Sequence, residues 1–355
     1  MVTQLDFFRP NAKLAGPFST RYQGSKAKLI PWIWENVKDL DFHTCLDAFG
    51  GTGSIAYLFK SQGKKVTYND HLHFNAISAT ALIENRATRL SDQDIEFATQ
   101  RHSAVLYDDL IERTFAEIYF LPDENRWLDV ACQNIARMQD KYKCALAYHA
   151  LFQSCITKRP YNLFHRKNLY MRTADVRRGF GNKATWDKPF DRHFRRFVEE
   201  ANNSVFDSGV PCRAICQDAL AVPGRFDLVY IDTPYLNSKG VGVDYLQFYH
   251  FLEGIADYKD WADRIDYRKK HRPLKGEKSP WSDPKRVVSA FEALFERYAE
   301  SILVVSYRSD GIPSEDVLVK LMKRFKGRVR VTRQKEYKYV LSTNGNSKEV
   351  LLIAQ

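Results

Sequence analysis

The glycine-rich segment Asp47-Ala48-Phe49-Gly50-Gly51-Thr52-Gly53 constrains the fold more than any other feature of the chain. An apolar run at residues 44–49 leads into it and predicts a strand, and the glycines predict a tight turn before a helix at 54–62. A second apolar run at 65–68 predicts another strand, which closes on Asn69-Asp70. This strand–helix–strand order predicts the opening of a doubly wound α/β sheet.

The rest of the chain divides into an insertion and a return to the sheet. Between about residues 72 and 205 the pattern is mainly helical, then basic, aromatic and poorly periodic. Helices are predicted at 29–37, 91–113 and 127–142, and further strands at 213–215, 226–231, 302–306, 328–339 and 349–354. The last two strands flank a turn-rich segment at 342–347 and are expected to pair antiparallel at the sheet edge. We therefore expect a discontinuous α/β domain (1–88 and 206–355) interrupted by a mainly helical one (89–205).

The charge balance favours a polyanionic partner. Lys and Arg number 54 against 43 Asp and Glu, which gives a formal net charge of +11. A basic protein without such a partner is the alternative. The six cysteines lack metal-ligand spacing and are too few for a disulfide scaffold, so we expect reduced thiols and no metal. With neither a leader pattern nor a long apolar run, the expected compartment is the cytoplasm, with no membrane contact.

The glycine loop and the acid after the second strand predict a nucleoside-binding site. Glycines let the backbone approach a ligand, and the helix N-terminus exposes free amides. Asp70 follows at the distance where a carboxylate accepts ribose hydroxyls, while Asp47 would repel a pyrophosphate and suits an ammonium such as that of a methionine moiety. The alternative is that the glycines serve packing and Asp70 caps a turn. The loop is not the full dinucleotide fingerprint, and a nicotinamide-dependent oxidoreductase explains neither the basic insertion nor the motif at residues 232–235.

The run Asp232-Thr233-Pro234-Tyr235 follows a buried strand, at the sheet edge where open α/β folds keep their active sites. An adenine amino group is a poor nucleophile, so an enzyme must accept its hydrogen bonds and align its lone pair. Asp232 is suited to accept one N–H and the carbonyl of Thr233 or Pro234 the other, while Tyr235 offers a face for an extruded base. The alternative is a strand that ends in a capped proline turn.

Together, these motifs resemble the Dam-like class of adenine-N(6) DNA methyltransferases of restriction-modification systems, bacterial chromosomes and phages. Residues 21–26 (Arg-Tyr-Gln-Gly-Ser-Lys) are similar to the family's segment ending in Gly-Gly-Lys, with Ser25 replacing the second glycine. The loop meets the Asp-x-Phe-x-Gly-x-Gly pattern, and Asn69-Asp70 meets the Asn-Asp that follows. Gln217-Asp218 and residues 305–311 resemble two later motifs. The clearest departure is Thr233, where the family usually carries proline.

The resemblance implies a Rossmann-like methyltransferase sheet that binds S-adenosylmethionine and releases S-adenosylhomocysteine, with the inserted domain recognising the DNA target. It implies direct in-line transfer to N(6) of a flipped adenine in double-stranded DNA. The implied catalytic residues are Asp232, Thr233, Pro234 and Tyr235. The implied cofactor-binding residues are Tyr22, Lys26, Asp47, Phe49, Gly51, Gly53, Asp70, Asp218 and Asp232.

Two basic stretches are candidates for DNA contact because they interleave cations with aromatic and amide side chains. The first spans residues 158–168 and supplies Lys158, Arg159, Tyr161, Asn162, Arg166 and Lys167, with Arg172, Arg177, Arg178 and Lys183 continuing its charge. The second supplies Arg268, Lys269 and Lys270. Solvated basic loops are the alternative for both. Residues 240–251 resemble the family's segment beside the target base, although core aromatics on a helix explain the same pattern.

Three other functions are alternatives. A cytosine-C(5) enzyme needs a Pro-Cys nucleophile after the glycine loop, and Pro211-Cys212 precedes Asp232 without a catalytic context. A cytosine-N(4) enzyme usually carries Ser where this chain has Asp232. A catalytically impaired DNA-binding homologue would account for Ser25 and Thr233. The recognition sequence and a cognate restriction endonuclease stay open, and a monomer is the expected state.

Overall fold

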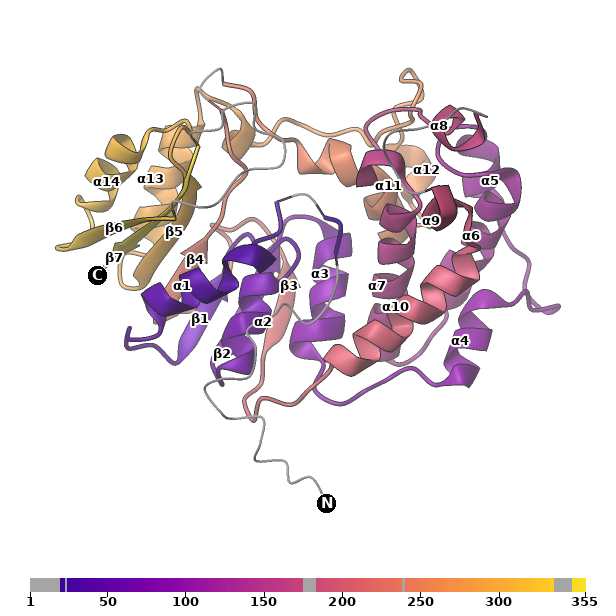
Figure 1. Cartoon of the computed structure of the whole chain (residues 1–355), viewed down its shortest axis with the longest axis horizontal. Coiled ribbons are helices and arrows are strands. Elements are labelled where there is room, and N and C mark those ends of the chain that lie inside the picture. Colours follow the sequence, from indigo (N-terminus) through magenta and orange to yellow (C-terminus); the bar gives the residue numbers. More distant parts are fainter. Residues whose placement is uncertain (1–19, 23, 175–182, 238–239, 335–346) are drawn as a thin grey trace.

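The computed structural model describes residues 20–22, 24–174, 183–237, 240–334 and 347–355. Its described strands form one seven-stranded sheet in the order β3-β2-β1-β4-β5-β7-β6 (Figure 1). The strands are β1 (Thr44–Asp47), β2 (Lys65–Asp70), β3 (Arg213–Cys216), β4 (Leu228–Ile231), β5 (Ile302–Arg308), β6 (Val329–Gln334) and β7 (Glu349–Ala354). The first five pair in parallel, and β7 runs antiparallel to both β5 and β6. The predicted doubly wound sheet with an antiparallel edge pair is therefore confirmed.

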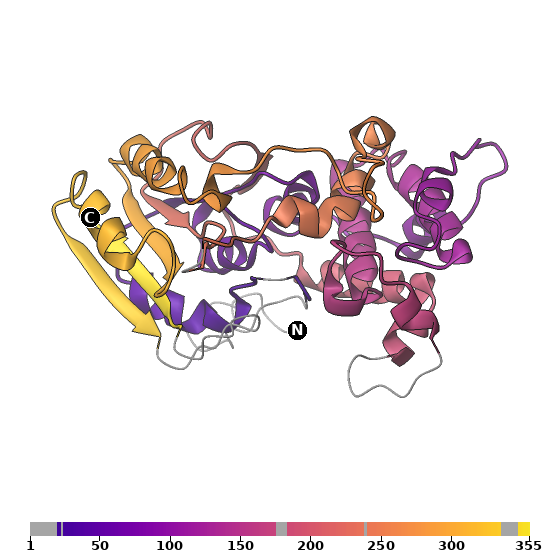
Figure 2. The same cartoon turned by 90° about the horizontal axis from the view of Figure 1, so that it is seen from above.

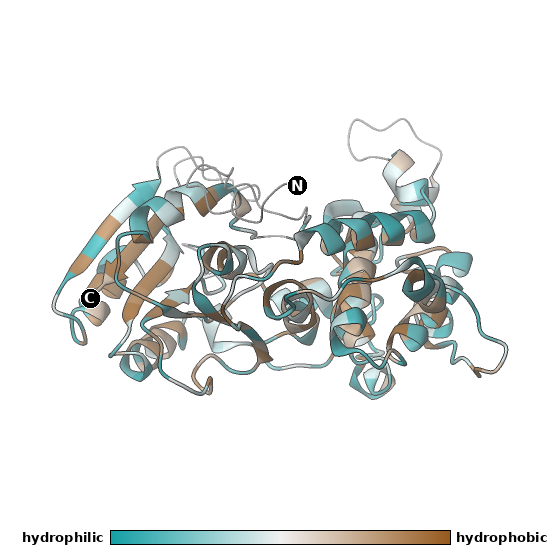
Figure 3. Ribbon diagram, turned by 90° about the horizontal axis from the view of Figure 1, so that it is seen from below, coloured by the Kyte–Doolittle hydropathy of each residue, from teal (hydrophilic) through white to brown (hydrophobic). Residues whose placement is uncertain are grey.

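Alternating side chains along each strand fill two cores on opposite faces of the sheet. Leu228 and Tyr230 of β4 pack with α1 (Ile30–Val37) and α2 (Ser54–Ser61). Val229 and Ile231 point the other way, into a core shared with α13 (Val287–Arg297) and α14 (Glu315–Met322). Figure 3 shows these strands as largely hydrophobic. Helices on both faces bury the central strands, which explains their continuous apolar runs.

The glycine loop takes its shape from backbone geometry and from one aromatic ring. Gly51 and Gly53 have φ of 50° and 75°, a region that favours glycine, and Gly53 is the N-cap of α2. At Gly50 an added Cβ would lie 2.0 Å from Cε2 of Tyr68 on β2. Any side chain at Gly50 would push the loop away from the sheet.

Helices make up the regular structure described between β2 and β3. They are α3 (His73–Ala79), η3 (Thr80–Glu84), α4 (Asp92–Thr99), α5 (Leu110–Thr114), α6 (Pro122–Ile135), α7 (Lys141–Thr157), η4 (Pro160–Asn162), α8 (Tyr170–Thr173), α9 (Lys183–Asp187) and α10 (Phe190–Ser204). After β4 come α11 (Tyr245–Ala256), α12 (Trp261–Arg264) and η5 (Pro280–Ser282), and η2 (Ala27–Leu29) precedes α1. Figures 1 and 2 show α4–α10 beside the sheet, along the long axis of the molecule.

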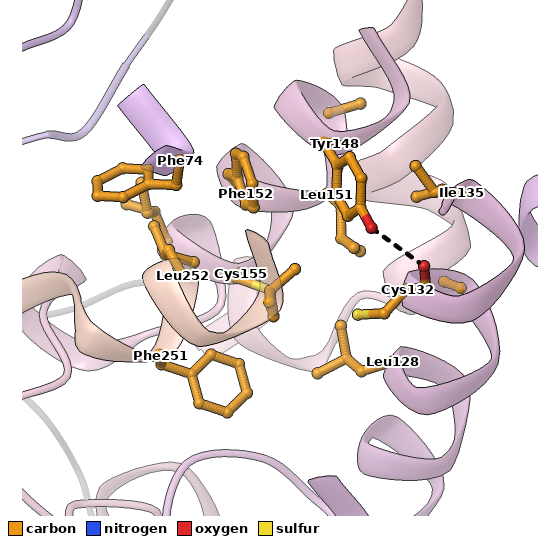
Figure 4. Packing of buried hydrophobic residues seen from close by; sticks show 14 of the residues in the cluster. Phe74, Leu128, Cys132, Ile135, Tyr148, Leu151, Phe152, Cys155, Phe251 and Leu252 are labelled. Atoms are coloured by element: carbon orange, nitrogen blue, oxygen red, sulfur yellow. Dashed lines mark hydrogen bonds between the residues drawn. The ribbon is translucent and has the colours of Figure 1, made fainter. Parts of the chain in front are cut away.

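The inserted helices share their core with the helices that flank the sheet. Figure 4 shows Phe74 of α3 and Leu252 of α11 near Phe152 of α7, with Leu128 and Cys132 of α6 on the other side of the cluster. Phe74 and Phe152 meet edge-on, with ring centroids 5.7 Å apart. The helical part is therefore continuous with the rest of the molecule through α3 and α11.

Three predicted elements differ in the structure. The helix predicted at 91–113 is two helices, because α4 ends before Gln100 and α5 begins only at Leu110. The helix predicted at 127–142 spans the boundary between α6, which ends at Ile135, and α7. Asp140 caps the start of α7 by accepting N–H groups from Tyr142 and Lys143. The stretch after 142 that has little periodicity begins with α7, which is buried from Ala145 to Thr157, and ends with α10. Residues 335–346, which include most of the predicted turn, lie outside the described residues.

Within the described residues, no helix is both long enough and apolar enough to cross a membrane.

Candidate active site

A cavity of about 680 Å³ opens at the carboxyl ends of the central parallel strands. Asp47 at the end of β1 and Asp232 after β4 both line it, at the point where the strand order reverses. Its lining also includes the predicted residues Tyr22, Lys26, Phe49, Gly51, Asp70, Asp218, Thr233, Pro234 and Tyr235. The structure therefore brings the N-terminal segment, the glycine loop and the catalytic motif together in one place.

Two acids hold the glycine loop against the sheet. Asp47 is buried, and its Oδ2 accepts the Ala56 N–H at 3.2 Å. Asp70 accepts the N–H of Gly51 through Oδ2 and that of Leu72 through Oδ1, each at 2.8 Å. Burial raises the pKa of both carboxyls, and the nearby Asp232 raises that of Asp47 further. A cationic or hydroxyl-bearing ligand beside them would offset this loss of solvation.

Aromatic rings form the walls of the cavity. Tyr22 stacks on Tyr249 and Tyr245 of α11, with ring centroids 4.4 and 5.7 Å apart. Phe49 meets Trp281 edge-on at 4.9 Å, so Trp281 belongs to the site although its sequence context gave no signal. The helical 245–251 segment supplies both lining side chains, such as Tyr245, and buried core aromatics, such as Phe251. The core interpretation therefore holds for part of the segment, while its place beside the target base stays a prediction.

The catalytic motif is tied together by hydrogen bonds. The hydroxyl of Tyr235 donates to Oδ1 of Asp232 at 2.6 Å, and Nζ of Lys26 lies 3.2 Å from the same oxygen. Burial raises the pKa of Asp232 to about 6, and Lys26 opposes that rise. The Oγ1 of Thr233 is buried and has no hydrogen-bond partner within the described residues. At neutral pH the site thus presents an ionised carboxylate beside a buried ammonium.

Glu349 is a site residue that sequence reasoning missed. Its carboxylate is fully buried, lies 2.9 Å from Nζ of Lys26 and accepts a hydrogen bond from Ser306 on β5. The residue begins β7, and the antiparallel pairing of β7 carries it to the edge where the parallel strands end. No local pattern connects it with Lys26, so only the sheet topology identifies it.

Three predicted residues have other roles. Gly53 is not among the residues that line the cavity; it is the N-cap of α2, where an added Cβ would lie 3.7 Å from Tyr68. Lys158 and Arg159, predicted to contact DNA, are buried directly after α7, so they cannot reach a phosphate in this structure.

The partners of these two cations lie inside the protein. Lys158 pairs with Glu124 at 2.8 Å, and Glu124 also pairs with the buried Arg172. Arg159 donates to the carbonyl of Leu163 at 3.1 Å and to the side chain of Asn168. These charges hold α6 and the segment after α7 together, which corrects the prediction for Lys158 and Arg159 and for the charge of Arg172.

The other basic candidates are accessible, and their two loops meet. Tyr161, Arg166, Lys167, Arg268, Lys269 and Lys270 are exposed, and Asn162 is half-buried. The hydroxyl of Tyr119 lies 2.5 Å from the Phe164 carbonyl of the first loop and 2.7 Å from the His271 carbonyl of the second. The exposed cations of the two loops, Arg166 and Lys167 on the first and Lys269 and Lys270 on the second, therefore project from loops that meet at the hydroxyl of Tyr119. Arg177 and Arg178 lie outside the described residues.

A doubly wound sheet with an acid-flanked glycine loop and an Asp-x-Pro-Tyr motif in one cavity defines a methyltransferase that acts on an amino group. Residues 22–308 match the D12 class N6 adenine-specific DNA methyltransferase family, and the chain belongs to it. It is thus an adenine-specific DNA methyltransferase that methylates N6, and enzymes of this class take the methyl group from S-adenosylmethionine.

Relatives extend over most of the chain. The type II methyltransferase M2.HphI of Haemophilus parahaemolyticus is 26% identical over 85% of this chain and 87% of its own length. M.CviAII of Paramecium bursaria Chlorella virus 1 is 22% identical over 93% of this chain and 96% of its own length. The modification methylase StsI of Streptococcus sanguinis is 26% identical over 93% of this chain, which spans 50% of that protein. All three names are those of DNA-modifying methylases.

Proposed function

We propose that the single cavity holds both partners of the reaction, the cofactor beside β1 and β2 and a flipped adenine beside β4. The observation that carries this proposal is that Asp232 lines the same cavity as the glycine loop and Asp70. The volume of about 680 Å³ suits a ligand of nucleoside size with room for a base. When bound, S-adenosylmethionine supplies the electrophilic methyl group.

The donor set around the glycine loop supports a cofactor that is cationic at one end and carries a ribose. Asp70 accepts the ribose hydroxyls while the Gly51 N–H holds it in place. Asp47, whose carboxylate is poorly solvated, suits the ammonium of the methionine moiety. Tyr22 and Phe49 supply aromatic surface, and Asp218 at the exposed end faces the cofactor adenine. Lys26 and Gly53 then act indirectly, through Asp232 and through the turn into α2.

Asp232, Thr233 and Tyr235 prepare the target amino group. Asp232 accepts one N–H, and the carbonyl of Thr233 or Pro234 accepts the other, so the nitrogen lone pair points at the methyl carbon. The ring of Tyr235 is fixed by its hydroxyl bond to Asp232 and by an edge contact with Tyr307 at 5.3 Å. Because the ring of Tyr235 is already fixed, aligning a base on it costs no further ordering of the ring. Bound S-adenosylmethionine would supply the methyl group and keep the electrons of the broken C–S bond on its sulfur, while the amino nitrogen would give up one proton, which Asp232 is placed to accept.

The test measures transfer and binding separately. Purified protein is incubated with tritiated S-adenosylmethionine and duplex DNA of mixed sequence, and the labelled nucleoside is identified after digestion. The expected product is N6-methyladenine, lost by at least a thousandfold in Asp232→Ala while cofactor affinity stays within about threefold. Normal turnover in Asp232→Ala would refute the mechanism, and label on cytosine would refute the assigned base. Cofactor binding with no transfer by the wild type would support the impaired-homologue alternative.

We further propose that residues 89–205 recognise the target, while 1–88 and 206–355 form the catalytic domain. Helices α4–α10 fall within the first range and the strands within the second, which supports this division. The similarity of residues 21–26 and of the loop also supports a narrower placement among Dam-like enzymes. The type II names of the relatives support a cognate restriction endonuclease, and a monomer remains the proposed state.

The proposed DNA surface combines Arg166 and Lys167 with Lys269 and Lys270, the exposed pairs of the two loops joined at Tyr119. Each phosphate contact contributes about 0.9 to the slope of log K against log salt concentration. Removing either pair by alanine substitution should therefore lower the slope by up to ~1.8, and removing both pairs by up to ~3.6.

The matched control for this surface is a pair of exposed lysines elsewhere. Lys320 lies on α14 and Lys323 caps its C-terminus; both are exposed, and α14 packs on the face of the sheet opposite α1 and α2. Lys320→Ala with Lys323→Ala removes the same net charge and should leave the slope unchanged within error. Equal slopes for the wild type and the four-residue variant would remove both loops from the interface.

A further inference from the structure

Glu349 is a fully buried carboxylate that the mechanism above does not use. It lies 2.9 Å from Nζ of Lys26, and its Oε1 is 3.3 Å from the hydroxyl of Tyr235. Lys26 in turn lies 3.2 Å from Oδ1 of Asp232. Two carboxylates thus bracket one ammonium, and the Tyr235 hydroxyl lies between them.

We propose that Glu349 is a positioning residue for methyl transfer, which anchors the Lys26 ammonium and so keeps Asp232 available to the target amino group. The inference rests on the proposed role of Asp232. An ammonium buried beside one carboxylate would close onto it, because a desolvated ion is stable only with a counter-charge at short range. Sharing Lys26 between two carboxylates leaves Asp232 with lone pairs that the amino group can use.

The fold holds Glu349 at this point from both sides. Glu349 pairs with Arg308 of β5 and with Gln334 of β6 in the antiparallel register, so its backbone is fixed between two strands. Ser306 donates a hydrogen bond to the carboxylate. Since β7 runs opposite to the parallel strands, its first residue lies at the edge where their last residues lie. The anchor is therefore as rigid as the sheet itself.

The charges around Asp232 set how the enzyme responds to pH. Burial is the largest influence and raises the pKa of Asp232, Lys26 and the Tyr235 hydroxyl lower it, and Glu349 raises it. Asp47 on β1 and Tyr230 on β4 also face it, since the Asp232 charge raises the pKa of both. Removing the charge of Glu349 should lower the pKa of Asp232, because one repulsion is lost and Lys26 moves closer.

The test compares Glu349→Gln with the wild type in kcat, in KM for DNA and in cofactor affinity, from pH 5 to pH 9. We expect kcat at pH 8 to fall tenfold or more, cofactor affinity to change less than threefold, and the acid limb of kcat to move to lower pH. A purely structural role would not move that limb. Wild-type kcat with an unmoved limb would overturn the proposal.

Two further variants keep the result interpretable. Glu315→Gln breaks the ion pair of Glu315 with Arg333 on the neighbouring β6, away from the cavity, and should retain wild-type kcat. If Glu349→Gln does not fold, Glu349→Asp withdraws the charge by one methylene and should lower kcat severalfold without moving the limb to lower pH. Undiminished kcat in Glu349→Asp would overturn the proposal. Activity in Asp232→Ala would instead overturn the assigned role of Asp232, whatever the Glu349 variants do.

Discussion

Tyr119 is expected to set both the stability of the helical part and the affinity for DNA, because its hydroxyl joins the two basic loops. The hydroxyl is buried and lies 2.5 Å from the Phe164 carbonyl, 2.7 Å from the His271 carbonyl and 2.8 Å from Nε2 of His250. Burial lowers the pKa of His250 to about 3, so its ring is neutral under assay conditions. Its Nδ1 has no hydrogen-bond partner within the described residues, which favours the proton on Nε2.

The geometry gives a magnitude for Tyr119→Phe. Nε2 of His250 also contacts the Phe164 carbonyl at 3.0 Å, so this carbonyl keeps a donor when the hydroxyl is removed. The His271 carbonyl loses the donor that Tyr119 offers it. A fully buried acceptor left without a donor costs about 1–3 kcal/mol; because the His271 carbonyl is only partly buried, we expect the free energy of unfolding to fall by about 1 kcal/mol.

The assay for Tyr119→Phe combines urea denaturation with DNA binding at several salt concentrations. Tyr119→Phe keeps the aromatic ring, so the packing of the aromatic core around it is kept. We expect the salt dependence to weaken as well, because the loop bearing Lys269 and Lys270 is no longer held beside the loop bearing Arg166. A loss below about 0.5 kcal/mol, the range of a neutral surface change, together with an unchanged salt slope, would refute this reasoning.

Three more predictions concern single groups. Because burial raises the pKa of Asp232 to about 6, kcat should fall as pH drops through about 6. The same raised pKa stabilises the folded state below pH 3.8, and this stabilisation is lost as pH rises through 6. Asp232→Asn should therefore unfold at a higher urea concentration than the wild type at pH 8. Thr233→Val removes a buried hydroxyl without a partner in the described residues and should stabilise the protein by up to ~1 kcal/mol in urea denaturation, with turnover retained. Lys158→Met should leave the salt slope of DNA binding unchanged. It should lower the free energy of unfolding by about 3 kcal/mol or more, because Glu124 loses one of its two buried cations. A reduced salt slope would return Lys158 to the interface.

The sheet and the cavity acids were predictable because both follow from short-range patterns. A strand buried on two faces is a continuous apolar run, as at β4, and the residue after it must lie at the carboxyl edge. Asp47, Asp70 and Asp232 each follow such a run, so the sequence brings them to one edge before any contact is known. Helix α7 was missed for the related reason that burial on all sides removes the periodicity by which a surface helix is identified.

The errors concern pairings that only the tertiary fold determines. Lys158 and Arg166 belong to one basic stretch, yet one is buried against Glu124 and the other is exposed. Sequence shows the charge of each but not its partner, so a basic stretch overstates the number of cations available to a phosphate. Glu349 shows the opposite error, since a residue in a terminal strand reaches the catalytic motif only through the order of strands in the sheet.

The separation of charge in this enzyme suits the two ligands that we propose it holds at the same time. The chain carries a formal net charge of +11, yet the acids Asp47, Asp70, Asp232 and Glu349 gather in and behind one cavity with Lys26 among them. An acidic interior favours a cationic methyl donor and repels phosphate, while exposed cations on the loops favour the DNA backbone. If the loops hold the duplex as proposed, the part of a nucleotide that fits this acidic cavity is its uncharged base. In the proposed mechanism, the field that favours the cationic cofactor also keeps the phosphates outside, so that Asp232 can accept from the amino group without a competing anion.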